Sequence, residues 1–417
     1  MSKISSERIV LFFMILFIIW ISFVPDPIKF QYNNVFNIIL WILFLVSFFK
    51  KRHDFKEYFL DNGKFFWVYL FLFSINIYFS QNKLSSYVYY RDFVLSAIPI
   101  YYLARNEINS KNVKSVLYVL CICAGLVAFF GFLEMLFERN IIYERYISNY
   151  FYHRYLIEEK RMMSTLAHPN ILGSYLITCL PLAYYFYKSE KRKTLKNFNF
   201  TVFLVIFSAM VFTFSRGTYL AGFLTFLILL ILKKRFKTVI FVLCLGILFI
   251  IFCSLRLYVI SEFTHRFSIQ RLWSYLSTGH RTGAYLVTWN MLRHHPFVGI
   301  GLNNFRLVFN EYSSLRLPHE LMIPDSVYLM HLAETGVIGS VGFIIFLESI
   351  IKRSFLCYKK SEGYRKEMFS VVLIGFTAML FNVNTFDAFL WKTSFYLFWL
   401  VIGLIISFDR EISSSER

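Results

Sequence analysis

The sequence contains few of the short motifs that identify soluble enzymes. It has no glycine-rich phosphate loop, no serine nucleophile elbow and no paired-cysteine metal site. Its formal net charge is +19, but we find no basic helix or aromatic-basic module of the kind that binds nucleic acid. The six cysteines all lie in apolar segments or in a basic loop. We therefore expect no disulfide, no resident metal, no cofactor and no nucleic-acid partner.

Apolar residues dominate the composition and occur in blocks. Hydrophobic residues make up 57% of the chain and Phe alone occurs 51 times, whereas soluble domains are about 45–50% apolar. A spanning helix needs roughly 20 mostly apolar residues. The pattern predicts an all-α, polytopic membrane protein with one integral membrane domain over residues 1–417 and about twelve spans. The predicted spans are 9–24, 35–49, 65–80, 87–103, 116–133, 171–186, 199–214, 218–232, 239–254, 336–351, 369–382 and 393–407.

The distribution of basic residues predicts the orientation in the membrane. If the N-terminus is cytoplasmic, 27 of the 44 Lys and Arg residues lie in the cytoplasmic segments. Cytoplasmic loops of membrane proteins carry this excess of positive charge. We therefore expect both termini on the cytoplasmic side, and the segments 134–170 and 255–335 on the outer side.

The outward basic residues differ in type from the inward ones. Thirteen of the 17 are Arg, whereas the inward set holds 18 Lys and 9 Arg. The guanidinium group binds phosphate and carboxylate groups bidentately. The bias therefore predicts an outward site for an anionic ligand. The outward arginines are Arg91, Arg139, Arg145, Arg154, Arg161, Arg216, Arg256, Arg266, Arg271, Arg281, Arg293, Arg306 and Arg316.

The large outward loop 255–335, between the ninth and tenth spans, is predicted to be partly helical, since structureless loops of this length are uncommon. Residues 281–295 resemble an amphipathic helix whose apolar stripe is Tyr285, Trp289 and Leu292. Residues 326–335 predict a second helix. Asp325 is its expected N-cap, and Gly336 is its expected break.

The first candidate site motif is Ser215-Arg216-Gly217, at a tight outward turn between two predicted spans. An arginine at membrane depth is costly and indicates function, although an interface anchor that reaches toward water also explains it. Gly217 permits a close backbone approach. We expect Arg216 to be catalytic and Ser215 to bind substrate.

The second motif contains Arg281, in the first turn of the predicted helix 281–295. There the guanidinium group and the helix N-terminus can face the same anion. The following Gly299-Ile300-Gly301 segment is typical of a plain turn as well as of a binding loop. We expect Arg281 to be catalytic.

The third motif is Asp325, whose carboxylate can accept a proton from an acceptor hydroxyl. The N-cap interpretation of Asp325 is compatible with this role. His319 lies in the same outer loop, either as a surface residue or as a catalytic one.

The fourth motif joins Arg161 to His168-Pro169-Asn170, at the start of the sixth predicted span. These side chains could bind sugar hydroxyls, but a turn followed by a helix cap explains His168 and Asn170 equally well. Arg91 and Arg306, from the outward set, complete the candidate substrate-binding residues.

Taken together, the motifs resemble the O-antigen ligase and polymerase superfamily. The pattern comprises Ser215-Arg216-Gly217, then Arg281 with the Gly299–Phe305 segment, then Tyr328-Leu329 and the glycines that follow. The resemblance covers about 161–340. Ligases of this family typically carry His at the position of Asp325, which leaves the polymerase assignment open and makes His319 a candidate replacement.

The resemblance implies a metal-independent, inverting glycosyltransferase of the GT-C type in the bacterial inner membrane. Its donor would be an undecaprenyl-diphosphate-linked glycan on the periplasmic side. Its acceptor would be another glycan or lipid A–core, as in lipopolysaccharide assembly. The residues matching Arg216 and Arg281 would hold the diphosphate leaving group, since guanidinium groups can neutralise its charge.

Two other functions fit part of the pattern. A transporter or flippase for lipid-linked oligosaccharides would also have many spans and a basic pathway, but it predicts charged residues deep within the spans and two related halves. A non-catalytic scaffold of a polysaccharide-assembly complex would tolerate the loss of the motif arginines.

Overall fold

The computed structural model describes residues 6–50, 64–140, 152–232, 280–313 and 322–415, together with residues 234 and 237. The regular elements of these residues are helices. In chain order they are α1 (Ser6–Phe23), α2 (Asp26–Gln31), α3 (Asn33–Lys50), α4 (Lys64–Phe79), α5 (Lys83–Tyr89), η3 (Tyr90–Val94), α6 (Leu95–Glu107), α7 (Val113–Phe137), η4 (Tyr152–Glu158), η5 (Ser164–Leu166), α9 (Pro169–Ser189), α10 (Lys193–Phe212), α11 (Arg216–Leu232), α15 (His280–His294), α16 (Phe309–Tyr312), α17 (Val327–Lys360), α18 (Gly363–Asn382), η8 (Ala388–Leu390) and α19 (Lys392–Ser415).

Several of these helices are long and apolar enough to cross a bilayer, so the protein is a helical membrane protein. Among the described residues, five helices meet this criterion. They are Asn33–Lys50, Val113–Phe137, Lys193–Phe212, Val327–Lys360 and Lys392–Arg410, and three shorter apolar helices lie at Ile9–Phe23, Phe65–Phe79 and Arg216–Leu232. The total of twelve spans stays a prediction, and the predicted span 239–254 lies outside the described residues.

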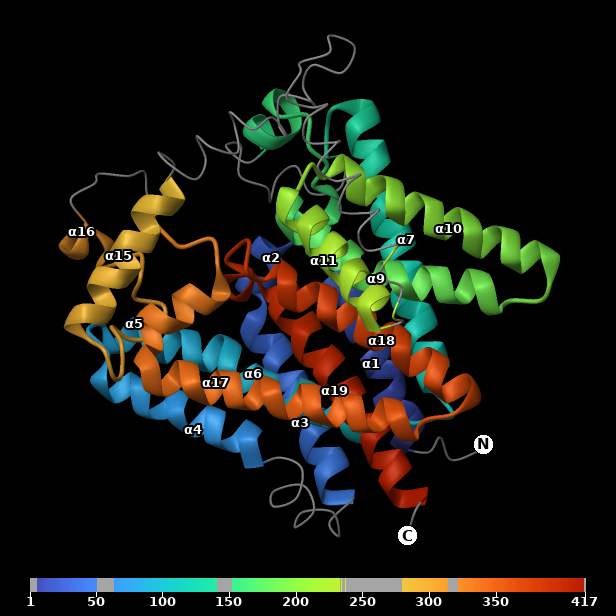
Figure 1. The fold of residues 1–417 in the computed structure, drawn as a ribbon, viewed down its shortest axis with the longest axis horizontal. Coiled ribbons are helices and arrows are strands. Elements are labelled where there is room, and N and C mark those ends of the chain that lie inside the picture. The colour runs from blue at the N-terminus through green and yellow to red at the C-terminus, as the bar shows by residue number, and fades with distance from the viewer. Residues whose placement is uncertain are drawn as a thin grey trace.

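Helix α19 is the centre of the bundle. It packs against α1, α6, α9, α17 and α18, and it lies among them in Figure 1. Its aromatic residues Tyr396 and Trp399 are fully buried. A helix that is apolar all round is expected at such a central position, because every face contacts another helix.

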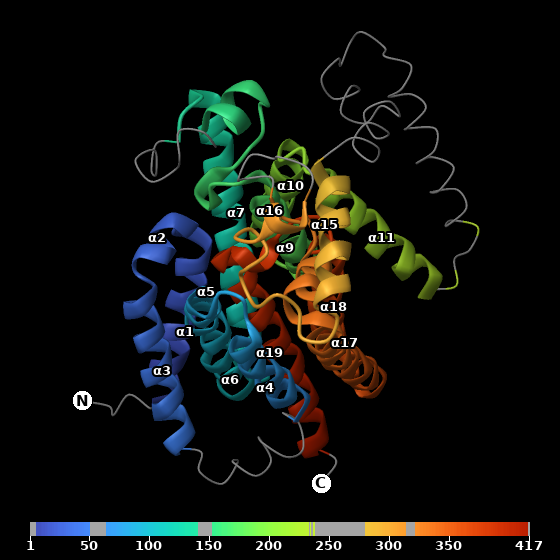
Figure 2. The same cartoon turned by 90° about the vertical axis from the view of Figure 1, so that its left-hand side faces the viewer.

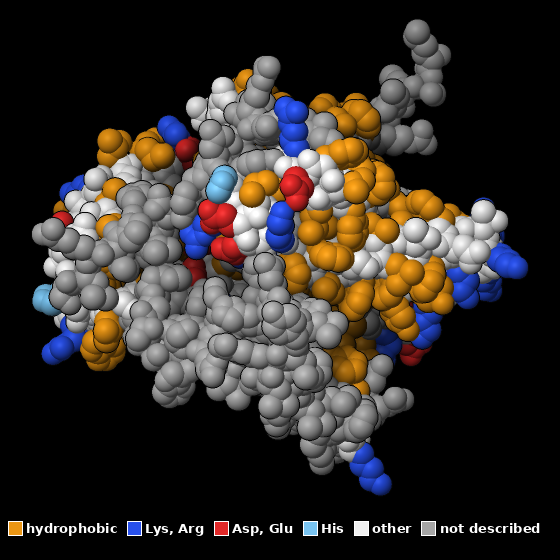
Figure 3. All heavy atoms as spheres, turned by 90° about the horizontal axis from the view of Figure 1, so that it is seen from above, with side chains coloured by type: hydrophobic (Ala, Val, Ile, Leu, Met, Phe, Trp, Pro, Cys, Tyr) orange, Lys and Arg blue, Asp and Glu red, His pale blue; other side chains and the backbone are white. Residues whose placement is uncertain are grey.

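The outer helices carry large apolar side chains on their exposed faces. Phe200, Leu204 and Phe207 of α10 are 40–44% exposed, and Val35 and Ile38 of α3 are about 60% exposed. Figure 3 shows apolar side chains over one flank of the molecule, in the view from above. Apolar surface of this extent is unusual for a water-soluble monomer and suits contact with lipid.

The bundle has two distinct ends. Helices α3 and α19 end at the lower edge of Figures 1 and 2, whereas α2, η8 and the start of α19 lie toward the opposite end. Most of the candidate site residues occur in the connections at this upper end. Near the middle of the upper face, Figure 3 shows basic, acidic and histidine side chains gathered together.

Helix α17 is interrupted at Gly336, where the backbone has φ 62° and ψ −166°. The predicted break is therefore confirmed. The N–H groups of Val337 and Ile338 donate to the carbonyls of Pro296 and Phe297, at 2.8 and 3.1 Å. Because the break frees backbone groups from the helical pattern, a neighbouring segment must satisfy them. These two hydrogen bonds attach the loop after α15 to helix α17 at the break.

Candidate functional site

The segment before α9 brings three predicted residues together. Arg161 donates from Nη2 to Asn170 Oδ1 at 3.0 Å and from Nε to the Thr213 carbonyl at 2.9 Å. His168 precedes α9, and its Nδ1 accepts a hydrogen bond from the Asn170 N–H at 3.2 Å. His168 is therefore the N-cap of α9, as one of the two sequence interpretations predicted.

The imidazole of His168 is held in its neutral form. Burial, together with the charge of Arg161, lowers the pKa of His168 to about 3. Since Nδ1 accepts from Asn170, we assign the ring proton to Nε2, which lies 3.2 Å from the Tyr155 hydroxyl. The ring also lies 5.3 Å from the Trp391 ring, centroid to centroid. His168 can orient its neighbours but is not poised as a general acid.

The Ser215-Arg216-Gly217 motif forms the predicted tight turn. Helix α10 ends at Phe212 and α11 begins at Arg216. Ser215 is buried, and its hydroxyl lies 3.4 Å from the Thr218 N–H at the start of α11. Arg161 donates a hydrogen bond to the Thr213 carbonyl in this turn. The Ser215-Arg216-Gly217 motif and the motif of Arg161 and His168 therefore form one structural unit.

The turn between α18 and α19, residues 383–391, lies directly against this unit. A Cβ at position 217 would lie 2.0 Å from Thr385 Oγ1, so only glycine allows the two turns to approach this closely. The Asn382 side chain donates to the Thr218 hydroxyl at 3.3 Å. We call residues 383–391 the central turn. It contains none of the candidate site residues predicted from the sequence.

Buried charges attach the end of the central turn to the first helices. The Thr393 hydroxyl donates to Asp26 Oδ1 at 2.6 Å, and Lys29 donates to the same oxygen at 3.1 Å. Asp26, Lys29 and Thr393 are fully buried. Removing one partner from such a network leaves an uncompensated buried charge. Arrangements of these helices that separate the partners are therefore unfavourable. The start of α19 is thereby held in place.

Asp325 lies immediately before α17 and is half-buried. The N-cap of α17 is Ser326, whose hydroxyl accepts from the Leu329 N–H at 3.4 Å. The predicted N-cap role of Asp325 is therefore wrong by one residue. Ser326 also donates to Asn384 Oδ1 at 2.8 Å, and this places Asp325 beside the central turn. Since Ser326 supplies the cap, the Asp325 carboxylate is not needed for it.

Asp387 in the central turn is the acidic residue that sequence reasoning missed. Burial and the charge of Asp325 raise the pKa of Asp387 to about 6, while Arg306 acts in the opposite direction. Asp325 also influences the titration of His168. Asp325 is therefore within electrostatic range of both His168 and Asp387, and Arg306 is within range of Asp387. A lone acidic residue in a short turn between two predicted spans was the sequence signal for Asp387.

The Gly299-Ile300-Gly301 segment packs against the interrupted helix α17. Gly299 and Gly301 have positive φ, and a Cβ at Gly299 would lie 2.5 Å from the Glu334 backbone. Ile300 and Gly301 donate their N–H groups to the carbonyls of Ala333 and Glu334, at 3.0 and 2.9 Å. The segment therefore serves as a structural turn, and it carries Arg306 to the edge of the site.

Helix α15 confirms the predicted helix 281–295, but its buried face differs from the predicted stripe. Ala284, Val287 and Met291 are buried, whereas Tyr285 and Trp289 are 41% and 58% exposed. Val287 and Met291 belong to a small apolar core that α15 shares with α17. Arg281 is in the first turn of α15, as predicted. Its side chain and His319 lie outside the described part of the molecule.

Arg91 has a different environment from the other candidates. Its Nε donates to Asp92 at 2.6 Å, and its side chain is 44% exposed. The Asp92 carbonyl accepts from Lys392 at 3.2 Å, so Arg91 lies beside the start of α19. No described hydrogen bond connects it to the site residues above, and its substrate-binding role stays a prediction.

These features define a helical membrane protein with an arginine- and carboxylate-bearing candidate site at one end of the bundle. Residues 201–344, about a third of the chain, match the family model described as O-antigen ligase. The match supports the resemblance to the O-antigen ligase and polymerase superfamily. The matched region contains Ser215, Arg216, Arg281, Arg306 and Asp325. A comparison with curated proteins found no match.

Proposed function

We propose that the protein transfers a glycan from an undecaprenyl-diphosphate-linked donor to an acceptor hydroxyl on the periplasmic face of the inner membrane. The observation that carries the proposal is the meeting of the Arg161 and Arg216 motifs with two acidic residues at one end of the bundle. Arginines can hold a diphosphate bidentately. A carboxylate can take the proton of an attacking hydroxyl.

In the proposed reaction, the acceptor oxygen attacks the anomeric carbon of the donor sugar. The bond between that carbon and the diphosphate oxygen breaks, and undecaprenyl diphosphate leaves. The acceptor proton passes to Asp325, with Asp387 beside it. Arg216 and Arg281 stabilise the charge on the leaving diphosphate, which is where charge develops in the transition state. Attack from the face opposite the leaving group inverts the configuration.

The carboxyl groups of Asp325 and Asp387, which we call the acidic pair, suit a base that works near neutral pH. A catalytic base is most effective when its pKa lies near the working pH, and the Asp387 pKa is raised to about 6. Two neighbouring carboxyl groups titrate as a pair. We therefore propose that Asp325 and Asp387 together accept the proton, with Asp325 facing the acceptor.

A product assay tests the proposal. Purified protein is mixed with an undecaprenyl-diphosphate-linked repeat unit, with and without lipid A–core, and the products are separated on a gel. A ladder without lipid A–core indicates a polymerase. A single shifted product that requires lipid A–core indicates a ligase. A transporter or a scaffold forms no covalent product in either mixture.

Lysine variants test the diphosphate role of the arginines. Arg216→Lys and Arg281→Lys keep the charge but lose the planar fork, so each should lower transfer by about 10–100-fold. The matched control is Arg293→Lys, an exposed residue in the last turn of α15, which should leave transfer unchanged. Full activity in both site variants would refute the diphosphate role.

A further inference from the structure

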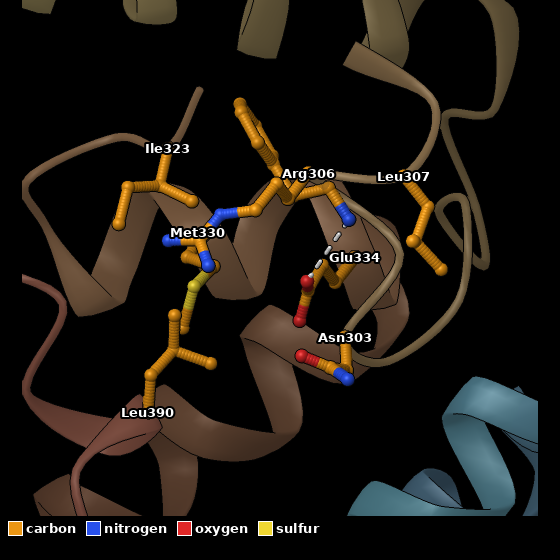
Figure 4. Close-up of a pocket in the computed structure, with 8 residues that line it drawn as sticks. Asn303, Arg306, Leu307, Ile323, Met330, Glu334 and Leu390 are labelled. Atoms are coloured by element: carbon orange, nitrogen blue, oxygen red, sulfur yellow. Dashed lines mark hydrogen bonds between the residues drawn. The ribbon is translucent and has the colours of Figure 1, made fainter. Parts of the chain in front are cut away.

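A cavity of about 210 Å³ lies beside the central turn, which contributes Leu390 to its lining. It is partly open and lies between the turn after Gly301, the segment before Asp325, the first two turns of α17, and η8. Figure 4 shows these residues around the space. The lining residues are Asn303, Phe305, Arg306, Leu307, Ile323, Met330, Glu334 and Leu390.

Arg306 supplies the positive charge of this cavity. Its side chain extends across the space, and its guanidinium group lies between Ile323 and Met330 (Figure 4). The Nε atom is buried and has no hydrogen-bond partner among the described residues. A buried donor without an acceptor is unfavourable. An anionic group in the cavity would satisfy this donor and form a charge-assisted pair.

The Glu334 carboxyl group is not the hydrogen-bond acceptor for Arg306 Nε. Its carboxyl oxygen accepts from the Phe305 N–H at 3.2 Å, and Figure 4 shows the carboxyl group turned toward that backbone and away from the guanidinium. Two lining residues, Ile323 and Leu390, are within three residues of Asp325 and Asp387 in the chain, so the cavity adjoins the acidic pair. Arg306 is within electrostatic range of Asp387 and lowers its pKa.

The size and lining of the cavity limit what it can hold. Sites for drug-sized ligands measure about 300–1,000 Å³, so a cavity of about 210 Å³ accommodates one ring. The lining is mixed: Leu307, Ile323, Met330 and Leu390 contribute apolar side chains, and Asn303, Arg306 and Glu334 contribute polar ones. A pyranose ring has a matching character, because its C–H faces are apolar and its edge is polar.

We propose that this cavity binds a single acidic sugar of the acceptor glycan, a hexuronic acid whose carboxylate pairs with Arg306. The inference rests on the proposed function. The cavity adjoins the acidic pair through Ile323 and Leu390, whereas the arginine motifs of α9 and α11 meet the central turn at Thr385. With the donor diphosphate on the arginine side, the cavity is on the acceptor side of the base.

Binding of soluble sugars to the purified full-length protein tests the proposal without requiring transfer. The probes are methyl β-D-glucuronide and its neutral analogue methyl β-D-glucoside, titrated by saturation-transfer NMR. A charge-assisted hydrogen-bonded pair should favour the glucuronide by about 10–100-fold. Arg306→Gln should remove that preference, whereas Arg293→Gln on the exposed end of α15 should keep it.

Arg306→Lys serves as the second variant, because it keeps the charge if the glutamine variant does not fold. It should reduce the preference by about tenfold. Equal binding of the two sugars by the wild-type protein, absence of glucuronide binding, or an undiminished preference in a folded Arg306 variant would overturn the proposal. Glucuronide binding without transfer of any glycan in the product assay would instead refute the proposed function and leave the acidic-sugar site standing.

Discussion

Replacing Gly217 with alanine tests whether the turn before α11 must lie directly against the central turn. A Cβ at this position would lie 2.0 Å from Thr385 Oγ1 and 2.5 Å from Thr385 Cβ. Rotation of the threonine side chain moves Oγ1 but not Cβ, so the backbone must shift. Restoring the 3.4 Å of an ordinary contact requires the two turns to separate by about 0.9 Å.

The expected result is a large loss of activity with a modest loss of stability. A misplacement of about 1 Å near reacting groups can lower the rate about 100-fold, whereas overpacking typically costs about 1–3 kcal/mol. We therefore expect about a 100-fold decrease in transfer rate by Gly217→Ala in the product assay. A thermal melt of the same sample should show that the protein still folds.

A matched control and a rescue make this test specific. Gly222→Ala is on the same helix, but its Cβ would contact only Ile177 Cδ1, at 2.9 Å. That atom is the end of a flexible side chain, so activity should be retained. Thr385→Gly removes both clashing atoms and should restore much of the activity to Gly217→Ala. Activity within about threefold of wild type in Gly217→Ala, or equal losses in both alanine variants, would refute the reasoning.

Two further predictions concern the acidic pair and the start of α17. The carboxyl group of Asp387 loses its proton as the pH rises through about 6. The transfer rate should therefore be flat above this pH and fall about tenfold per pH unit below it. Asp387→Asn should abolish this inflection and lower the rate about 10²–10⁴-fold. A pH–rate profile whose inflection persists in Asp387→Asn would contradict this assignment. Ser326→Ala should destabilise the protein by about 1 kcal/mol through loss of the N-cap, whereas Asp325→Asn should leave the melting temperature nearly unchanged and lower transfer. A lower melting temperature with unchanged transfer in Asp325→Asn would show that Asp325 has the structural role.

Local features of the site were predictable because local interactions control them. The tight turn at Ser215 follows from a short polar motif between two apolar segments, and the break at Gly336 follows from glycine's access to positive φ. The helix at 281–295 follows from its hydrophobic periodicity. Its buried face was predicted incorrectly, since Tyr285 and Trp289 gave the stronger apolar signal but the smaller Ala284 and Val287 fit the packed side.

The position of Asp387 shows what the sequence did not reveal. Its neighbours Phe386 and Ala388 are apolar, and no motif marks it. Its role depends on Asp325, which is 62 residues earlier and comes near only because α17 and α18 carry the two segments to the same end of the bundle.

By itself the sequence determined the membrane setting, the helical class and the turns around Arg216 and Gly336, and it predicted an outward arginine bias. Hydropathy, charge asymmetry and backbone preferences are properties of short segments, and they do not require knowledge of distant contacts. Only the tertiary structure decided that the starts of α9, α11 and α17 meet at the central turn. It also decided that Ser326 caps α17 in place of Asp325, and that Arg306 lines a cavity beside the acidic pair. These features depend on packing between segments far apart in the chain, where glycine contacts, buried hydrogen bonds and desolvated charges select one arrangement.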